Sequence, residues 1–236
     1  MYDVIIVGGG PGGLSAALVL GRARRNVLVI DNEMARNFVV NQSHGFLTRD
    51  SVSPKKLRQL AREEIEKYET VQFIMMTAER IKKEGETFTI QSGIHTYEAK
   101  KVIIATGLKE RLSSIKGLKE VYGNLIYSCP YCDGWEYRNK KLVIIGNGDN
   151  LLNYVKLIRT WSQDISVSTN GQITCSKEDR TSIKNRQIPI VEDEIVEIFS
   201  DADKLKILYS NGHVIDYDAG FCCKQMLSSI QIYQNN

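Results

Sequence analysis

Residues 4–13 read Val-Ile-Ile-Val-Gly-Gly-Gly-Pro-Gly-Gly, and this stretch decides the expected fold. The apolar, β-branched run suits a strand buried on both faces of a parallel sheet, and the glycines follow it at once. In the spacing G-x-G-x-x-G, Gly8 permits a tight turn, Gly10 lets the backbone approach a pyrophosphate, and Gly13 lets the next helix pack close to the strand. The stretch therefore predicts the start of a dinucleotide-binding βαβ unit.

Two later strands are expected to end beside the same nucleotide. Residues 26–30 form a second apolar run that ends in Asp31, about twenty residues beyond the glycines, where an acid accepts hydrogen bonds from ribose hydroxyls. Residues 101–105 form another buried strand, which ends in the small-residue turn Thr106-Gly107. That turn would bring backbone against the nucleotide, and the first unit is expected to close there.

The segments between these strands give weaker signals. A helix is predicted from the cap Ser53 and the first-turn Pro54 to about residue 68, with its charges on a solvated face. Short alternating stretches at 71–75, 87–91 and 95–99 suggest a small antiparallel meander. Residues 37–53 lack periodicity and predict a long loop, which is uncommon unless it is functional. His44 in this loop is a candidate for facing a cofactor, with a solvent-exposed histidine as the alternative.

A second strand, glycine turn and helix begin at residue 141. Gly146 and Gly148 occupy the first two positions of the fingerprint, but the third is Leu151, a bulky side chain where the helix should approach the strand. The strand at 165–168 leads into Thr169-Asn170-Gly171, without the arginine that would pair with a 2′-phosphate. A second dinucleotide-type fold is predicted, with a damaged fingerprint. Strands follow near 188–191, 194–199, 205–209 and 213–217, and residues 221–236 show no clear pattern.

Cys129 and Cys132 lie between the two glycine turns. A C-x-x-C pair suits reversible thiol–disulfide chemistry, because two intervening residues let the sulfurs meet while one thiolate is stabilised by its partner and the local backbone. The alternative is half of a zinc site completed by Cys222 and Cys223, although an adjacent pair is poor zinc spacing. The closeness of the motif to βαβ patterns favours the redox interpretation.

Composition restricts the class of protein. The chain has 236 residues, of which 42% are hydrophobic and 25% charged, values typical of a globular protein that is neither disordered nor fibrous. A net charge of +3, without a basic block, does not imply nucleic acid or anionic membrane as a partner. No apolar run is long enough to span a membrane, no secretory leader pattern precedes the first strand, and the five cysteines fit a reducing compartment. We therefore expect a cytoplasmic protein.

These motifs, in this order, resemble the low-molecular-weight thioredoxin reductases and their relatives among flavin-dependent dithiol oxidases. The resemblance covers roughly residues 1–221 and rests on the first glycine turn with Asp31, on the strand ending at Gly107, and on the stretch Cys129 to Gly134. It implies an α/β fold of two Rossmann-like units with parallel sheets and small antiparallel meanders. Residues 1–114 would bind FAD, residues 115–221 would form an NAD(P)-binding-like unit that carries the cysteines, and residues 222–236 stay unassigned.

The resemblance also implies roles at the cysteine motif. Cys132 would be the sulfur nearer the flavin, Cys129 the thiol that exchanges with substrate, and Asp133 the acid that shuttles a proton. A partly buried carboxyl with a raised pKa can supply the proton that the leaving sulfur needs. The alternative for Asp133 is a structural Asp-Gly turn.

Two departures from the family pattern affect the predicted function. The damaged second fingerprint weakens the expectation that NADPH is the electron source. The electron donor or acceptor is therefore left open among NADPH, a reduced protein and oxygen. Nothing after Phe221 matches the family's return segment to the flavin unit, so we expect a C-terminally truncated chain. The leading hypothesis is an FAD-dependent thiol–disulfide oxidoreductase, acting on a thioredoxin-like protein or a small dithiol or disulfide, with a homodimer as the family's assembly. The alternative is a non-catalytic remnant that binds a nucleotide or a partner.

Overall fold

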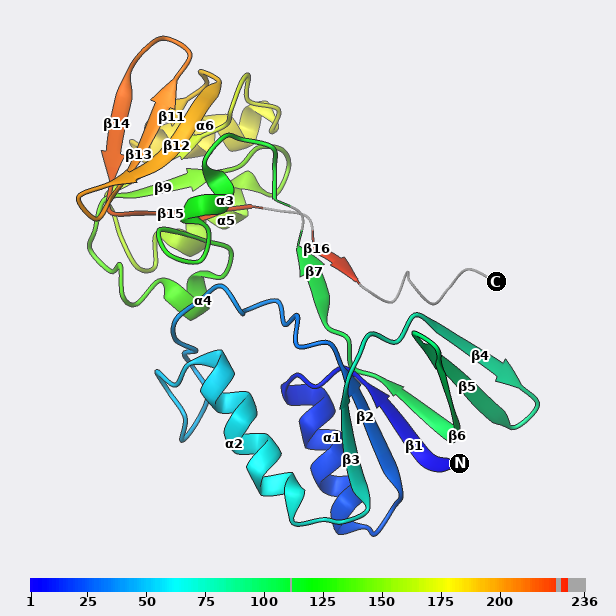
Figure 1. The fold of residues 1–236 in the computed structure, drawn as a ribbon. Coiled ribbons are helices and arrows are strands. Elements are labelled where there is room, and N and C mark those ends of the chain that lie inside the picture. Colours follow the sequence, from blue (N-terminus) through cyan, green and yellow to red (C-terminus); the bar gives the residue numbers. More distant parts are fainter. Residues whose placement is uncertain (111, 224–225, 229–236) are drawn as a thin grey trace. The chain divides into compact units, whose positions relative to one another are not determined.

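The computed structural model describes residues 1–110, 112–223 and 226–228 (Figure 1). They divide into two compact units. Unit 1 contains Met1–Phe38, Val52–Glu110 and the strand Met226–Ser228, and unit 2 contains Val39–Ser51 together with residues 112–223. The loop 39–51 thus belongs to unit 2, whereas the sequence placed it within a first domain of residues 1–114. Within the described part of the chain, no helix combines the length and the apolar character needed to cross a membrane.

Unit 1 is built on a mixed sheet flanked by two helices. Its elements are β1 (Tyr2–Val7), α1 (Pro11–Arg22), β2 (Val27–Asp31), α2 (Pro54–Glu66), β3 (Val71–Met75), β4 (Arg80–Glu84), β5 (Thr87–Ser92), β6 (His95–Ile104), β7 (Leu108–Glu110) and β16 (Met226–Ser228). Among the described residues the main sheet has the order β3-β2-β1-β6-β5-β4. The first four strands are parallel, and β4, β5 and β6 form an antiparallel meander.

The continuous apolar run of β1 is explained by burial on both faces. Val4 and Ile6 pack in a cluster with Leu14 of α1 and Ile65 of α2. Ile5 and Val7 point to the opposite face, where residues of the meander cover them. Because strand side chains alternate between faces, a strand covered on both sides reads as uninterrupted apolar sequence.

Two expectations about this sheet were wrong. Residues 71–75 are a parallel edge strand beside β2 and take no part in the meander, whose third member is instead β4. The two strands expected at 95–99 and from 101 are one strand, β6, which pairs with β5 through its first half and with β1 through its second. A single strand with two kinds of neighbour changes its side-chain pattern along its length, so the sequence suggested two strands.

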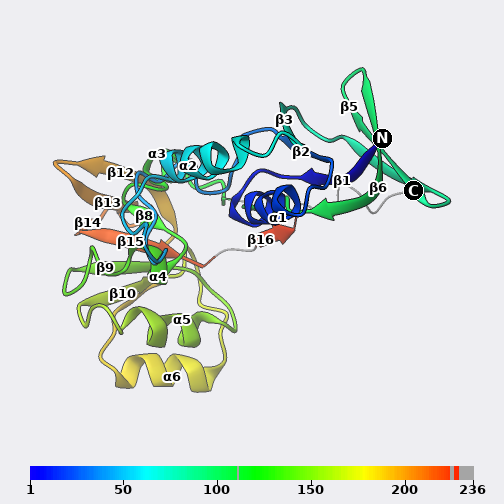
Figure 2. The ribbon, with the colours of Figure 1, turned by 90° about the horizontal axis from the view of Figure 1, so that it is seen from below.

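Unit 2 has a parallel sheet between two different layers. Its elements are α3 (Leu118–Val121), β8 (Ile126–Tyr127), α4 (Pro130–Asp133), β9 (Leu142–Ile145), α5 (Leu151–Ile158), β10 (Ile165–Ser168), α6 (Lys177–Asn185), β11 (Ile190–Val191), β12 (Ile195–Asp201), β13 (Lys204–Tyr209), β14 (Val214–Tyr217) and β15 (Ala219–Cys222). In the described residues the parallel sheet has the order β11-β10-β9-β15-β8. The helices α5 and α6 cover one face, and the antiparallel sheet β12-β13-β14 lies on the other (Figure 2).

The end of the chain differs from the expectation that nothing regular follows residue 221. Phe221 and Cys222 belong to β15, a buried strand between β9 and β8. Residues 226–228 form β16, which pairs antiparallel with β7 of unit 1. The remaining tail residues expected to be unassigned, 224–225 and 229–236, lie outside the described residues.

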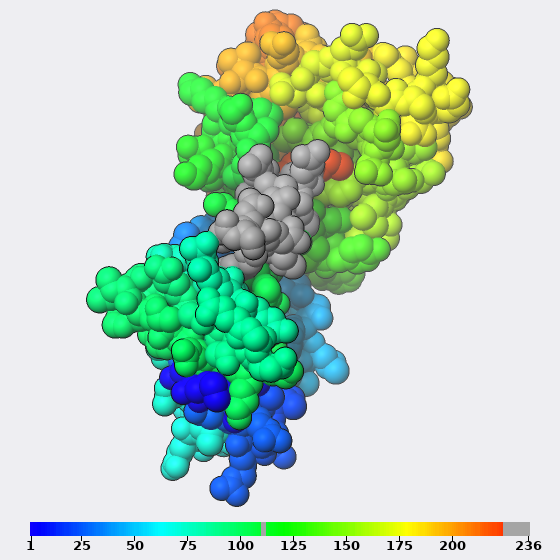
Figure 3. Space-filling view, turned by 90° about the vertical axis from the view of Figure 1, so that its right-hand side faces the viewer, coloured from blue at the N-terminus to red at the C-terminus, as the bar shows by residue number. Residues whose placement is uncertain are grey.

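In the space-filling view of Figure 3 the meander (teal to green) lies at the surface of unit 1 and α6 (yellow) at that of unit 2.

Candidate functional site

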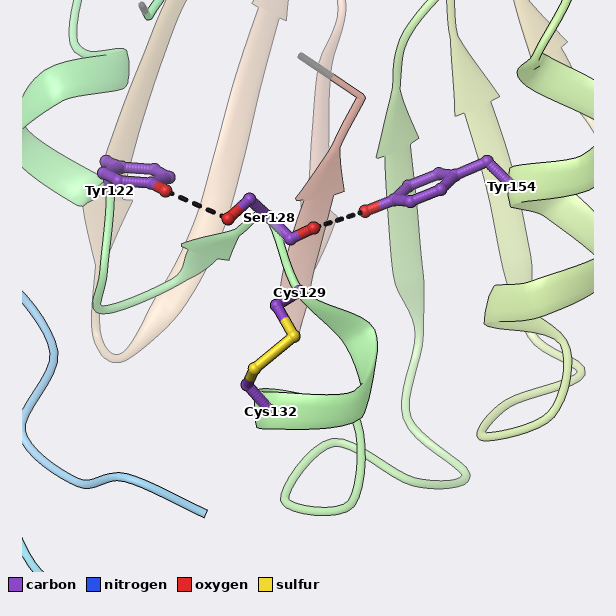
Figure 4. Close-up of a disulfide and its surroundings, with 5 residues drawn as sticks. All are labelled: Tyr122, Ser128, Cys129, Cys132 and Tyr154. Carbon is purple, nitrogen blue, oxygen red and sulfur yellow. Dashed lines mark hydrogen bonds between the residues drawn. A yellow bond between two sulfur atoms is a disulfide. The ribbon is translucent and has the colours of Figure 1, made fainter. Parts of the chain in front are cut away.

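The helix α4, one turn long, carries the cysteine motif in unit 2. Cys129 precedes the helix and Cys132 lies within it, and the two are joined by a disulfide with their Cα atoms 5.3 Å apart (Figure 4). The backbone N–H groups of Cys132 and Asp133 both donate to the Cys129 carbonyl, at 3.1 and 3.2 Å. One helical turn therefore brings the two sulfurs to bonding distance, as reversible disulfide chemistry requires.

Two tyrosines hold the residue before this disulfide. The Tyr122 hydroxyl donates to Ser128 Oγ at 3.2 Å, and the Tyr154 hydroxyl donates to the Ser128 carbonyl at 3.2 Å (Figure 4). Burial raises the pKa of Tyr154 above its ordinary value, which keeps its hydroxyl a neutral donor. The tyrosines fix the backbone that enters Cys129. No motif in the sequence marks them.

Gly134 is the residue at which α4 ends, and the ring of Trp161 packs closely against it. A Cβ atom at this position would lie 2.5 Å from the Pro130 carbonyl oxygen and 2.7 Å from the nearest ring atom of Trp161. Trp161 also meets Tyr131 edge-on, with ring centroids 5.3 Å apart. Gly134 has a helical φ of −71°. The Asp-Gly pair is therefore the end of a tightly packed helical turn and needs glycine for space.

Asp133 lies in a small cavity beside the disulfide. The cavity has a volume of about 180 Å³, and its lining includes His44, Tyr127, Asp133, Glu136 and Tyr137. Burial and, to a smaller extent, the Glu136 carboxylate raise the pKa of Asp133 to about 6, and His44 acts in the opposite direction. A carboxyl of this kind exchanges a proton near neutral pH, which suits the role that the family resemblance implied.

His44 lies in unit 2, next to Asp133 and away from solvent. Its side chain is 17% exposed, and its two ring nitrogens each face a carboxylate: Nε2 lies 3.7 Å from Glu136 Oε1, and Nδ1 lies 3.7 Å from Asp50 Oδ1. The solvent-exposed alternative for His44 is therefore wrong. Sequence reasoning missed Glu136 as its partner, although Glu136 follows Asp133 by three residues, a one-turn spacing.

The first glycine turn in unit 1 has the shape of a phosphate cradle. Gly8 has a φ of +108°, and a Cβ there would lie 2.4 Å from the Ala105 carbonyl oxygen. A Cβ on Gly13 would lie 1.9 Å from the Gly8 carbonyl oxygen, so this glycine is required for the helix to pack on the turn. Gly10 is different, because no atom lies within 4 Å of its Cβ position. The open side at Gly10 fits the pyrophosphate of FAD.

The ends of β6 and β2 complete this cradle. The contact of Gly8 with Ala105 places Thr106 and Gly107 beside the turn, and Gly107 has a φ of +67° with open space at its Cβ position. The side chain of Asp31 lies against Gly9, where a Cβ would be 2.5 Å from Asp31 Oδ2. These residues together fit the ribose and pyrophosphate parts of FAD.

Arg62 is a member of this site that sequence reasoning missed. Its Nη2 lies 2.8 Å from Asp31 Oδ2, and its Nη1 lies 2.8 Å from Glu33 Oε1. Its Nε atom is buried without a hydrogen-bond partner among the described residues. The charged pattern of α2 suggested a solvated face, but this arginine instead orients the acid expected to bind ribose.

The second glycine turn is held by hydrogen bonds within the protein. Asn147 closes it, because its Nδ2 donates to the Thr169 and Gln172 carbonyls at 3.3 and 2.9 Å, and its Oδ1 accepts from the Gly148 N–H at 2.9 Å and the Thr174 N–H at 2.8 Å. The N–H of Gly148 is thereby used within the protein.

Two neighbouring positions agree with this closure. A Cβ on Gly146 would lie 2.9 Å from Cys223 Cβ, so Gly146 is needed for internal packing. Leu151 is 1% exposed and fills the core under α5. No atom lies within 4 Å of the Cβ position of Gly148, and the cofactor-binding role expected for Gly146 and Gly148 stays a prediction.

The zinc alternative requires Cys129, Cys132, Cys222 and Cys223 to meet. In the structure the first two are bonded to each other, while Cys222 is buried in β15 and Cys223 lies against Gly146. The described residues contain no group of three or more histidine, cysteine, aspartate or glutamate side chains arranged to hold a metal ion.

The raised pKa of Asp133 predicts a pH dependence of stability. A carboxyl with its pKa raised from 3.8 to about 6 by folding stabilises the folded state below pH 4, and this contribution is lost as pH rises through about 6. We expect the free energy of unfolding of wild type, measured in urea relative to Asp133→Asn, to fall by about 2 kcal/mol between pH 4 and pH 7. A difference independent of pH would contradict the burial of this carboxyl.

Known proteins are similar to this chain in sequence. The family described as pyridine nucleotide-disulphide oxidoreductase matches residues 2–223. A protein of Arthroderma benhamiae named "Probable thioredoxin reductase" is 39% identical over 177 residues, which is 72% of this chain and 44% of that relative. The chain thus spans less than half the length of this relative.

Solved structures agree with the sequence match. A thioredoxin reductase from Streptococcus pyogenes superposes with a TM-score of 0.86 at 25% identity, covering 96% of this chain and 77% of that one. An oxidoreductase from Agrobacterium tumefaciens gives a TM-score of 0.89 at 29% identity, with coverage of 98% and 78%. With a family match that covers residues 2–223, the chain belongs to the pyridine nucleotide-disulphide oxidoreductase family.

Proposed function

We propose that the protein is an FAD-dependent thiol–disulfide oxidoreductase that acts through Cys129 and Cys132. The observation that carries this proposal is the disulfide on α4 beside Asp133, a carboxyl with a pKa of about 6. FAD would be held by Gly8, Gly10, Gly13, Asp31, Thr106 and Gly107, with Arg62 orienting Asp31. When bound, the flavin accepts an electron pair from the reduced cysteines or supplies one to their disulfide.

The cysteines and Asp133 perform the exchange with substrate. A substrate thiolate attacks Sγ of Cys129, the Cys129–Cys132 bond breaks, and the Cys132 sulfur takes the proton of Asp133. A second substrate thiolate then attacks the mixed disulfide, so that the substrate leaves as a disulfide and Cys129 leaves as a thiolate. The substrate dithiol loses two electrons and the cysteine pair gains them. The reverse sequence reduces a substrate disulfide.

The substrate class follows from this chemistry. It is a dithiol or disulfide, either a small molecule or a thioredoxin-like protein, and relatives named as thioredoxin reductases support the second choice. Assembly as a homodimer and placement in the cytoplasm remain predictions. Nothing in the described residues favours the remnant hypothesis over this proposal.

A visible absorption spectrum tests the proposed function. We expect the purified protein, supplied with FAD, to show an oxidised flavin spectrum that anaerobic dithiothreitol bleaches. The Cys132→Ser variant should bind the same flavin but keep its colour, because its disulfide cannot form. A protein that takes up no FAD, or a variant that bleaches as fast as wild type, would contradict the proposal.

The closed second turn predicts that NADPH is not the electron donor. We expect an anaerobic excess of NADPH to leave the flavin oxidised over the period in which dithiothreitol reduces it, because Asn147 occupies the phosphate turn. Rapid bleaching by NADPH would show that the turn opens to a nucleotide.

A further inference from the structure

We propose that His44, with Glu136 and Asp50, forms a proton relay between solvent and Asp133, so that each turnover of the Cys129–Cys132 disulfide exchanges its proton through the histidine. This inference rests on the proposed function and deepens it. The exchange step passes the proton of Asp133 to Cys132, and a route to solvent would let Asp133 regain a proton before the next exchange even when the Cys132 proton leaves elsewhere.

The geometry supplies a route for that proton. Asp50 is 66% exposed at the outer end, and its Oδ1 lies 3.7 Å from Nδ1 of His44. Nε2 of His44 faces Glu136 Oε1 at the same separation, and His44, Glu136 and Asp133 line one cavity. A separation of 3.7 Å is closed by one water or a small side-chain movement. An imidazole between two carboxylates carries a proton by accepting at one nitrogen and donating from the other.

The other polar groups of the cavity do not compete for the proton. The hydroxyls of Tyr127 and Tyr137 lie 3.1 Å apart, and both donate to the carbonyl of Asn124. Burial raises the pKa of Tyr127 above its ordinary value, so it stays neutral. The imidazole and carboxylate side chains that share the cavity with Asp133 are therefore His44, on the loop 39–51, and Glu136, just after α4.

The loop of residues 39–51, which shows no periodicity in the sequence, belongs to unit 2 and supplies His44 to the cavity that Asp133 lines. Residues 39–51 cluster with the cysteine-bearing unit, and the loop is held locally by the Gly45 N–H, which donates to Asp50 Oδ1 at 2.8 Å. This bond fixes the same oxygen that faces His44. The loop thus brings a histidine and its carboxylate to the disulfide as a preformed pair.

The test measures reduction of the Cys129–Cys132 disulfide by dithiothreitol, trapped with iodoacetamide and counted by mass spectrometry, from pH 5 to pH 9. We expect His44→Ala to slow this step by about tenfold near neutral pH. Added imidazole should restore most of the rate, because it can occupy the space of the ring. His213→Ala is the matched control: His213 is an exposed histidine on the β13–β14 turn of the same unit, and its loss should change neither the rate nor the response to imidazole.

Two further variants separate relay from structure. Glu136→Gln keeps the shape of the cavity, and we expect it to slow the same step by a similar factor. In the double variant Asp133→Asn, His44→Ala, we expect the rate of Asp133→Asn alone and no response to imidazole.

The relay would be overturned if His44→Ala reacted as fast as wild type, if imidazole failed to restore its rate, or if the double variant lost activity additively. A wild-type disulfide that dithiothreitol does not reduce would instead contradict the proposed function.

Discussion

The disulfide chemistry of this protein depends on one helical turn. Cys129 and Cys132 meet because α4 is a single turn whose first carbonyl accepts from both the Cys132 and Asp133 N–H groups. That turn is held at its entrance by the tyrosine bonds to Ser128 and at its exit by the close contact of Gly134 with Trp161. This support on both sides positions the two bonded sulfurs.

The same turn determines where protons can move. It directs Asp133 into a cavity whose polar groups come from the residue three positions further on, Glu136, and from a loop distant in sequence, with His44. Burial and the neighbouring Glu136 carboxylate raise the pKa of Asp133, and His44 lowers it. The disulfide and Asp133 thus lie on one short segment of unit 2, while unit 1 contains the glycine turn proposed to hold FAD.

Much of this could be predicted from the sequence because it depends on local pattern. The first glycine turn, Asp31 and the cysteine pair are each marked by spacing, and the structure shows the close-packed turn and the disulfide that these patterns indicate. The role of Asp133 came only from the family resemblance and stays a prediction. Partners supplied by distant segments could not be predicted. Arg62 reads as surface charge on an amphipathic helix, and only the packing of α2 beside β2 reveals its contact with Asp31.

The other expectations that differ from the structure concern the pairing of strands, the strand β15 and the second glycine turn. Residues 71–75 alternate like a meander strand but join the parallel edge, since pairing across the sheet is decided by tertiary packing. The strand β15 is short and begins with Ala219 and Gly220, so it lacks a strong β pattern, yet it is buried between two neighbours. In the second glycine turn the sequence indicated damage at Leu151, but the main closure is by Asn147, whose partners come from the loop after β10.

A bound flavin and the Cys129–Cys132 pair are proposed to form one redox circuit. An anaerobic titration with dithionite tests this proposal by counting electrons per bound flavin. We expect about four electrons for wild type, two for the flavin and two for the disulfide, and about two for Cys129→Ser. Two electrons in both proteins would contradict it, because the disulfide would then stand outside the circuit.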